Sequence, residues 1–134
     1  MADKHYPHYL TVSEFYRLNI ACHVLWDAFP ETVGVFLVGS SLHRRDFRDV
    51  DIRLMLPKQP YEMLFPDAPA NPQGHAAWDL ICVSISDLLA RQCGLPIDFQ
   101  IQEMDWANEK FTAEHHTRNA VGLMINHFKD REAK

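Results

Sequence analysis

Residues 33 to 56 read VGVFLVGSSLHRRDFRDVDIRLML, and two predicted strands in this stretch decide the fold. The first is the apolar run 33–38, whose β-branched residues are typical of a strand that is covered on both faces. Gly39 and Ser40 close this strand. In the second, residues 49–56, apolar and polar side chains alternate, which predicts a strand with one apolar face.

Two helices and one more strand are predicted around this pair. Thr11 and Glu14 have the spacing of a capping box, which predicts the start of a helix, and Pro30 marks the end of that helix. Its expected buried face is Val12, Phe15, Cys22, Trp26 and Phe29. A second helix is expected over residues 74–92, stopped by Gly94, with a buried face formed by Ala77, Ile81, Ile85, Leu88 and Leu89. Residues 97–102 alternate and predict a further strand.

The remaining segments are expected to be less regular or to close the fold. Residues 57–72 hold Pro57, Pro60, Pro66, Pro69 and Pro72, which predicts a long surface loop with neither a helix nor an inner strand. In that loop Tyr61, Phe65 and Asp67 are either ligand contacts or idle side chains. A closing helix is expected to carry Ala120, Val121, Met124, Ile125 and Phe128.

This order of elements predicts an α/β protein of the α+β type, with a small mixed sheet packed against helices. The 134 residues form a single domain, 1–134, because a chain of this length has room for one core. Cys22, Cys82 and Cys93 have no C-x-x-C spacing, so we expect reduced, mostly buried thiols rather than a zinc site or disulfides.

Charge and hydropathy exclude several classes of protein. The formal net charge of −5 argues against a nucleic-acid coat or a polybasic membrane binder. No apolar run approaches the roughly 20 residues that span a bilayer, and the N-terminus lacks the charged-then-apolar order of a signal peptide. We therefore expect a soluble, cytoplasmic protein with no membrane partner.

Three aspartates carry the candidate chemistry. Asp49 and Asp51 are two apart on one predicted strand, so both project from the same face, and Asp98 is placed in the same way on another strand. If the strands are neighbours, two such carboxylates about 4 Å apart repel by roughly 4 kcal/mol at an effective dielectric constant of 20. Raised pKa values or bound Mg²⁺ or Mn²⁺ would offset this repulsion. The alternative is that Asp49 and Asp51 form the solvent face of an edge strand.

Three short motifs in this order resemble those of the DNA polymerase beta-like nucleotidyltransferase superfamily: Val38-Gly39-Ser40, Asp49-Val50-Asp51-Ile52 and Ile97-Asp98-Phe99. The resemblance implies a minimal single-domain member of that superfamily.

It also implies roles for individual residues. Gly39 and Ser40 would hold the triphosphate of a nucleoside triphosphate, Asp49 and Asp51 would ligate two Mg²⁺ ions, and Asp98 would help to hold one metal and orient the acceptor. Arg44 and Arg53 are candidates for contacts with phosphate. The implied reaction moves a nucleoside monophosphate to a hydroxyl acceptor, releasing pyrophosphate.

Several alternatives stay open on the sequence. The acceptor is a small molecule, an RNA end or a protein side chain, and a homodimer partner, a separate helical subunit or the proline-rich loop would help to hold it. The short spacer between Ser40 and Asp49 motivates a catalytically degenerate domain that binds nucleotide or a partner protein. An acidic interaction domain without a ligand is a third possibility. His115 and His116 as a metal pair or base, and Trp106 as a stacking surface for a nucleobase, are weaker candidates.

Overall fold

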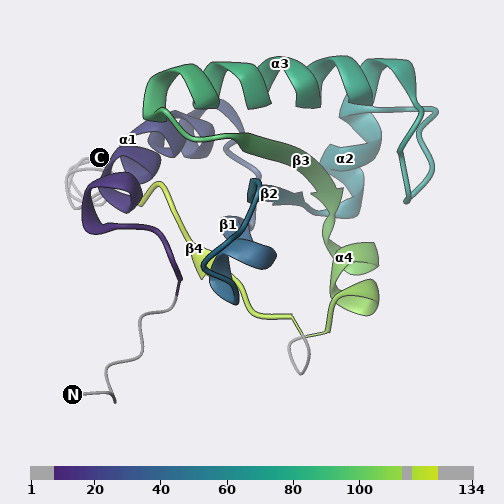
Figure 1. Ribbon diagram of the computed structural model, residues 1–134. Helices are drawn as coiled ribbons and strands as arrows, with labels where there is room; N and C mark the ends of the chain where they lie inside the picture. The colour runs from purple at the N-terminus through teal and green to yellow at the C-terminus, as the bar shows by residue number, and fades with distance from the viewer. Residues whose placement is uncertain (1–7, 113–115, 124–134) are drawn as a thin grey trace, which may run out of the picture.

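The computed structural model describes residues 8–112 and 116–123. Within them a four-stranded sheet, in the order β3-β2-β1-β4, packs against helices (Figure 1). In chain order the elements are α1 (Val12–Ala28), β1 (Gly34–Val38), the 3-10 turn η1 (Ser40–Leu42), β2 (Val50–Leu56), α2 (Lys58–Leu64), α3 (Ala76–Cys93), β3 (Ile97–Glu103), α4 (Met104–Lys110) and β4 (Asn119–Ala120). The predicted α+β class, with a small mixed sheet packed against helices, is confirmed.

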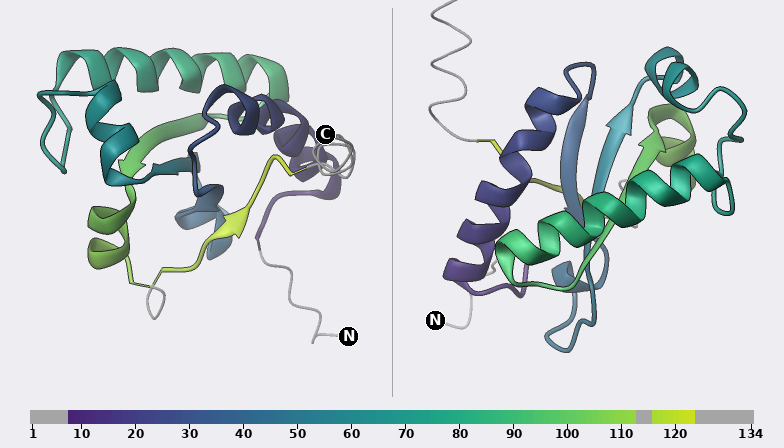
Figure 2. Two further views of the ribbon diagram at one scale, coloured as in Figure 1. Left: turned by 180° about the vertical axis from the view of Figure 1, so that it is seen from behind. Right: turned by 90° about the horizontal axis from the view of Figure 1, so that it is seen from above.

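The sheet is mixed because β2 has neighbours of both directions. It pairs antiparallel with β1, where Val38 lies opposite Asp51, and parallel with β3, where Asp51 lies opposite Asp98. A parallel pair needs a crossover connection, and α2 and α3 form it. The helices α1 and α3 contact each other and lie against β1 and β3 on one side of the sheet (Figure 2). The two long helices therefore do not cover the opposite face of the sheet.

The core lies between this sheet and the two long helices. Every second residue of β2 is buried there, and so are alternate residues of β1 and β3. These strand residues are Val35, Leu37, Val50, Ile52, Leu54, Leu56, Phe99 and Ile101. The predicted apolar face of residues 49–56 is confirmed. Met55, which the alternation places on the polar face beside Asp51, is buried as well, because α4 contacts β2 and covers that end of the face.

The helix α1 begins with the predicted capping box: the Thr11 hydroxyl accepts from the Glu14 amide N–H, and the Glu14 carboxylate accepts from the Thr11 amide N–H. Its buried face differs in part from the prediction. Leu18, Ala21, Cys22 and Leu25 are buried, and Phe15, Trp26 and Phe29 pack against them. Val12 is 85% exposed, because it begins the helix on its outer side.

The helix α3 confirms the second predicted helix and ends at Gly94, whose φ of 76° is left-handed. The buried face is formed by Trp78, Cys82, Leu89 and Cys93. Of the expected face, Ala77 and Leu88 are exposed. The predicted Leu89 is buried, and Ile81 and Ile85 pack against the core, while Trp78 and the two cysteines complete the buried face.

All three cysteines are free and buried, as expected. Burial raises the pKa of the Cys22 thiol to about 12 and that of Cys82 to about 11. These thiols therefore stay protonated at neutral pH and pack as small apolar groups.

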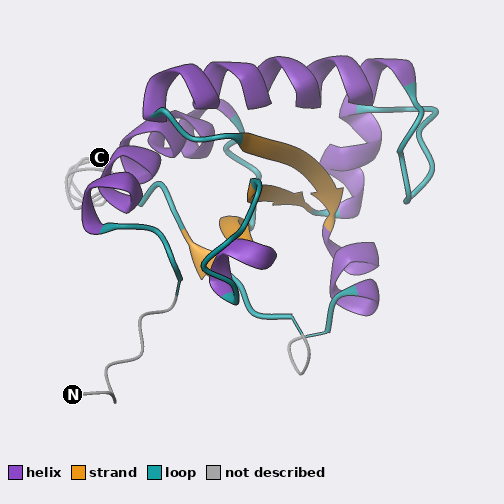
Figure 3. Ribbon diagram, in the orientation of Figure 1, coloured by secondary structure: helices purple, strands orange, loops and turns teal. Residues whose placement is uncertain are grey.

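The predicted loop 57–72 is wrong in its first half, because residues 58–64 form α2 (Figure 3). Pro57 is the N-cap of this helix, and Pro60 lies in its first turn, where backbone N–H groups have no partner within the helix. Proline therefore costs little at both places. Tyr61 and Phe65 are buried in the core rather than open to a ligand, and the Tyr61 hydroxyl donates to the Pro69 carbonyl oxygen at 3.1 Å.

The predicted closing helix also differs where it is described. Ala120 belongs to β4 and lies opposite Phe36 of β1. Gly122 has a φ of 83°, and its N–H donates to the Asn19 side chain at 2.8 Å, so no helix runs through it. Met124, Ile125 and Phe128 lie outside the described residues. In the part of the chain that is described, no helix is long and apolar enough to cross a membrane.

Candidate functional site

The sheet register brings the three sequence motifs to one place. Asp51 lies at the start of β2, between Val38 on β1 and Asp98 on β3. Gly39 directly follows Val38, so the Gly-Ser turn adjoins Asp51. Asp49 is exposed and lies just before β2, two residues from Asp51. The strands that carry Asp51 and Asp98 are neighbours, which is the condition that the sequence argument required.

Gly39 is required for two physical reasons. Its φ of 82° is in the left-handed region that favours glycine. A Cβ atom at this position would also collide with the Asp51 carboxylate oxygen Oδ2. The chain then enters η1, where the Leu42 amide N–H donates to the Gly39 carbonyl oxygen at 3.1 Å. The backbone of the turn and the Asp51 carboxylate are therefore in direct contact.

Asp51 has the most perturbed carboxyl group of the site. Its pKa is raised to about 6, because burial, together with the negative charges of Asp98 and Asp49, outweighs the lowering effect of Arg53. Because Asp49 and Asp98 both act on Asp51, the three carboxylates form one electrostatic cluster. A folded chain keeps such a cluster at a cost in stability that a bound cation would offset.

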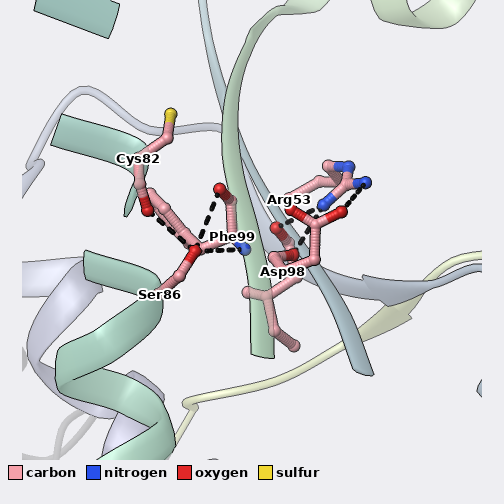
Figure 4. A network of polar contacts seen from close by, with 6 residues as sticks. Arg53, Cys82, Ser86, Asp98 and Phe99 are labelled. Carbon is pink, nitrogen blue, oxygen red and sulfur yellow. Dashed lines mark hydrogen bonds and ion pairs between the residues drawn. The ribbon is translucent and has the colours of Figure 1, made fainter. Parts of the chain in front are cut away.

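Arg53 lies on the same face of β2 as Asp51 and reaches across to β3. Its Nη1 donates to the Asp98 carbonyl oxygen at 2.7 Å, and its Nη2 lies 3.4 Å from the Asp98 carboxylate oxygen Oδ2 (Figure 4). The Arg53 side chain is 13% exposed and that of Asp98 43%. Asp98 therefore has a cation partner within the chain itself.

The start of β3 is fixed from the helix side as well. The Ser86 hydroxyl of α3 donates to the Cys82 carbonyl oxygen at 2.7 Å and accepts from the Phe99 amide N–H at 2.8 Å (Figure 4). This pair of bonds joins α3 to the residue that follows Asp98. The position of the Asp98 backbone is thus held from both sides of the sheet.

Arg44 lies elsewhere. Its guanidinium makes two hydrogen bonds to the Asp46 carboxylate, at 3.1 and 3.0 Å, on the exposed surface after η1. This pairing raises the pKa of Arg44 and lowers that of Asp46. Of the predicted site residues, the structure brings together Gly39, Asp51, Arg53 and Asp98, with Ser40 and Asp49 adjacent in the chain, and pairs Arg44 with a surface carboxylate.

A pocket of about 390 Å³ extends from this cluster over the polar face of the sheet. Asp51 and Arg53 line its base together with residues that alternate with Asp98 on β3. Its other walls come from α4 and from the segments on either side of the sheet. The lining residues are Val38, Gly39, His43, Asp51, Arg53, Met55, Gln73, Gln100, Gln102, Trp106, Phe111, His116, Thr117 and Arg118.

Some of the residues that line this pocket were predictable from the sequence. The alternation in residues 97–102 puts Gln100 and Gln102 on the face of Asp98, and Trp106 and His116 were weak candidates that do line the pocket. Arg118 was missed, because it reaches the pocket from a segment with no local pattern that marks it. His115 lies outside the described residues.

The donor chemistry of the cluster suits a hard divalent cation. Carboxylates offer oxygen ligands, which Mg²⁺ and Mn²⁺ prefer, and the raised pKa of Asp51 reflects burial of its carboxylate beside two like charges. Among residues 8–112 and 116–123, no three His, Cys, Asp or Glu side chains are already grouped to hold an ion. Asp98 would have to leave Arg53 for the three carboxylates to act as ligands together.

No family model matches the chain, and neither the curated proteins nor the solved structures contain a match.

Proposed function

We propose that the chain is a metal-dependent nucleotidyltransferase, which moves a nucleoside monophosphate from a nucleoside triphosphate to a hydroxyl acceptor. One observation carries the proposal: the Asp51 carboxylate lies between the backbone of the Gly39 turn and Asp98. A triphosphate needs backbone donors at close range, and glycine allows that approach. The same place offers carboxylates for the cation that accompanies the phosphates.

The residues divide the work as follows. Gly39 and Ser40 would bind the triphosphate, and Asp49, Asp51 and Asp98 would hold two Mg²⁺ ions, with Mn²⁺ as a substitute. When bound, such ions would neutralise the charge that develops on the transferring phosphate.

The bonds exchanged are these. The acceptor oxygen forms a bond to the α-phosphorus, the bond from that phosphorus to the bridging oxygen breaks, and pyrophosphate leaves with the electron pair. The hydroxyl proton of the acceptor is lost to water.

Arg53 has two roles in this proposal. While it pairs with Asp98, its positive charge partly offsets the repulsion between the Asp98 and Asp51 carboxylates. Once cations replace that positive charge, its guanidinium is free to donate to phosphate oxygens, for which its planar fork is suited. Arg44 requires the Asp46 pair to open before it reaches any phosphate.

A second candidate function is favoured by the same ion pair. In a degenerate domain the Arg53–Asp98 pair would be permanent and would replace the cation, leaving a site that binds nucleotide or a partner protein without transfer. The partner in that case is a second copy or a separate helical subunit.

Calorimetric titration distinguishes these functions. Each of the four nucleoside triphosphates is titrated with and without Mg²⁺ into the wild-type chain, Asp51→Asn and the matched surface control Asp87→Asn. The transferase predicts Mg²⁺-dependent binding that Asp51→Asn removes and Asp87→Asn keeps. Binding that is independent of both Mg²⁺ and Asp51 supports the degenerate domain. No binding of any triphosphate contradicts the transferase and a nucleotide-binding degenerate domain, and leaves only the binding of a partner protein.

A further inference from the structure

The pocket beside the aspartate cluster has the size of a small-molecule site. Its volume of about 390 Å³ is in the range of ligand pockets, which is roughly 300 to 1,000 Å³. The sheet forms its base, while Trp106 and Phe111 at α4 and residues 116–118 form its walls. A cavity with walls on several sides fits a small molecule better than an RNA end or a folded protein surface.

Arg118 is positioned at this pocket by the residues below and beside it. A Cβ atom at Gly34 would collide with the Phe36 ring, so the ring lies over the glycine on the polar face. The Arg118 guanidinium lies 5.9 Å from the centre of that ring. Its Nη1 donates to the Asn108 side chain at 2.8 Å, and its Nη2 lies 3.3 Å from the Phe111 carbonyl oxygen.

These contacts hold Arg118 in place. Among the described residues its three hydrogen-bond partners are neutral: the Asn108 amide and the carbonyl oxygens of Ala107 and Phe111. A guanidinium has five N–H donors, so donors remain for a ligand. In the part of the chain that is described, the ion pairs are Arg44–Asp46 and Arg53–Asp98, and neither involves Arg118. Burial lowers the pKa of Arg118.

The other lining groups suit a flat, polar ligand. Gln100 and Gln102 follow Asp98 on the polar face of β3 and offer amide donors and acceptors. Trp106, Phe111 and His116 offer aromatic surfaces, with adjacent rings edge to face at 5.8 and 5.3 Å between centres. Flat molecules pack well against such rings.

We propose that this pocket binds the acceptor, and that the acceptor is a small planar molecule whose carboxylate pairs with Arg118 while its hydroxyl group points toward Asp51. Only the role of this molecule as the acceptor rests on the proposed transferase. The binding of a planar carboxylate in the pocket needs neither a metal nor a nucleotide.

Indole N–H signals in ¹H–¹⁵N spectra test the proposal, with 4-hydroxybenzoate as the probe and neutral 4-hydroxybenzamide as its matched control. Trp106 lines the pocket, and Trp106→Phe assigns its signal. The indoles of Trp26 and Trp78 donate to the Val121 and Ile101 carbonyl oxygens and serve as internal controls. We expect the benzoate to shift the Trp106 signal alone.

Two variants test whether the positive charge of Arg118 binds the carboxylate. Arg118→Gln should weaken benzoate binding by about tenfold or more, because hydrogen bonds to charged groups contribute on that scale, and Arg91→Gln on the surface of α3 should leave it unchanged. Since Arg118 also holds α4, melting curves check that the variant folds. Thr117→Asp places a negative charge on the exposed rim beside Arg118 and should weaken binding of the benzoate but not of the benzamide.

Four results would overturn the proposal. Three concern the benzoate itself: no Trp106 shift at millimolar concentration, equal binding of the benzamide, or unchanged binding by both folded variants. The fourth is displacement of the probe by a nucleoside triphosphate alone, which would make the pocket a site for the nucleobase. The first three of these results do not involve nucleotide binding, and the fourth requires it. Failure of the benzoate test therefore does not contradict the proposed transferase, and failure of the calorimetric test does not contradict carboxylate binding in this pocket.

Discussion

Replacing Asp51 by asparagine should stabilise the fold at neutral pH while it abolishes function. The pKa of Asp51 is about 6 in the folded chain, against 3.8 for an ordinary aspartate. Two pKa units correspond to a ceiling of about 3 kcal/mol. Because the side chain is partly exposed, solvent screening reduces this to roughly 1 to 2 kcal/mol.

The sign follows from proton binding. Between pH 3.8 and about 6 the folded chain holds a proton on Asp51 that the unfolded chain has released. Stability due to Asp51 is therefore lost as the pH rises through this window, and the whole cost is present above it. Asparagine carries no charge at any pH, so the variant avoids that cost.

Urea unfolding of wild type and Asp51→Asn at two pH values measures the effect. We expect the variant to be more stable by roughly 1 to 2 kcal/mol at about pH 7.5 and equal to wild type at about pH 3.5, where Asp51 is protonated in both states. Asp87→Asn, on the exposed side of α3, should show no such pH dependence. A difference that is the same at both pH values, or a loss of stability at pH 7.5, would refute the reasoning from burial and like charge.

Three further substitutions test other parts of the structure. Gly39→Ala should cost more in urea unfolding than Gly74→Ala, because both positions have positive φ but a side chain at Gly74 meets nothing within 4 Å; equal losses would show that the Asp51 contact is unimportant. Pro60→Ala should change the unfolding free energy by less than about 1 kcal/mol, since its position in the first turn of α2 needs no N–H, and a large gain in stability would contradict that placement. Trp78→Phe should cost about 1 to 3 kcal/mol by leaving the Ile101 carbonyl oxygen without its 2.8 Å bond, and a neutral thermal melt would count against that bond.

Strands and helix ends were predictable where a local pattern encodes them. The alternation of residues 49–56 and 97–102 gives β2 and β3, the capping box at Thr11 gives the start of α1, and Gly94 gives the end of α3. Each depends on residues close together in the chain. Their accuracy therefore did not require knowledge of the tertiary structure.

Errors arose where position within an element matters more than residue type. The prolines in residues 57–72 predict a loop, yet Pro57 and Pro60 occupy the N-cap and first turn of α2, where proline fits. Aliphatic spacing predicts the buried face of α3, yet of those aliphatic residues only Leu89 is fully buried, and Trp78 and two cysteines form the rest of that face. A helix face depends on what packs against it, which local spacing does not contain.

The candidate site was likewise predictable only in part. Strand geometry predicts that Asp49 and Asp51 share a face, although β2 begins only at Val50, and the pairing of Asp51 with Asp98 depends on a parallel register across α2 and α3. The Arg53–Asp98 ion pair and the approach of Arg118 to Phe36 join residues 45 and 82 positions apart. No sequence pattern in the chain links such pairs.

The most direct test of the central claim is paramagnetic broadening by Mn²⁺ in the presence of tripolyphosphate, which all nucleoside triphosphates resemble in their phosphate chain. We predict that the backbone amide signals of Gly39, Asp51 and Asp98 broaden first and together at substoichiometric Mn²⁺, and that Asp51→Asn abolishes this. Broadening that begins at other surface carboxylates, or that persists unchanged in Asp51→Asn, would contradict a cation and triphosphate site at this edge of the sheet.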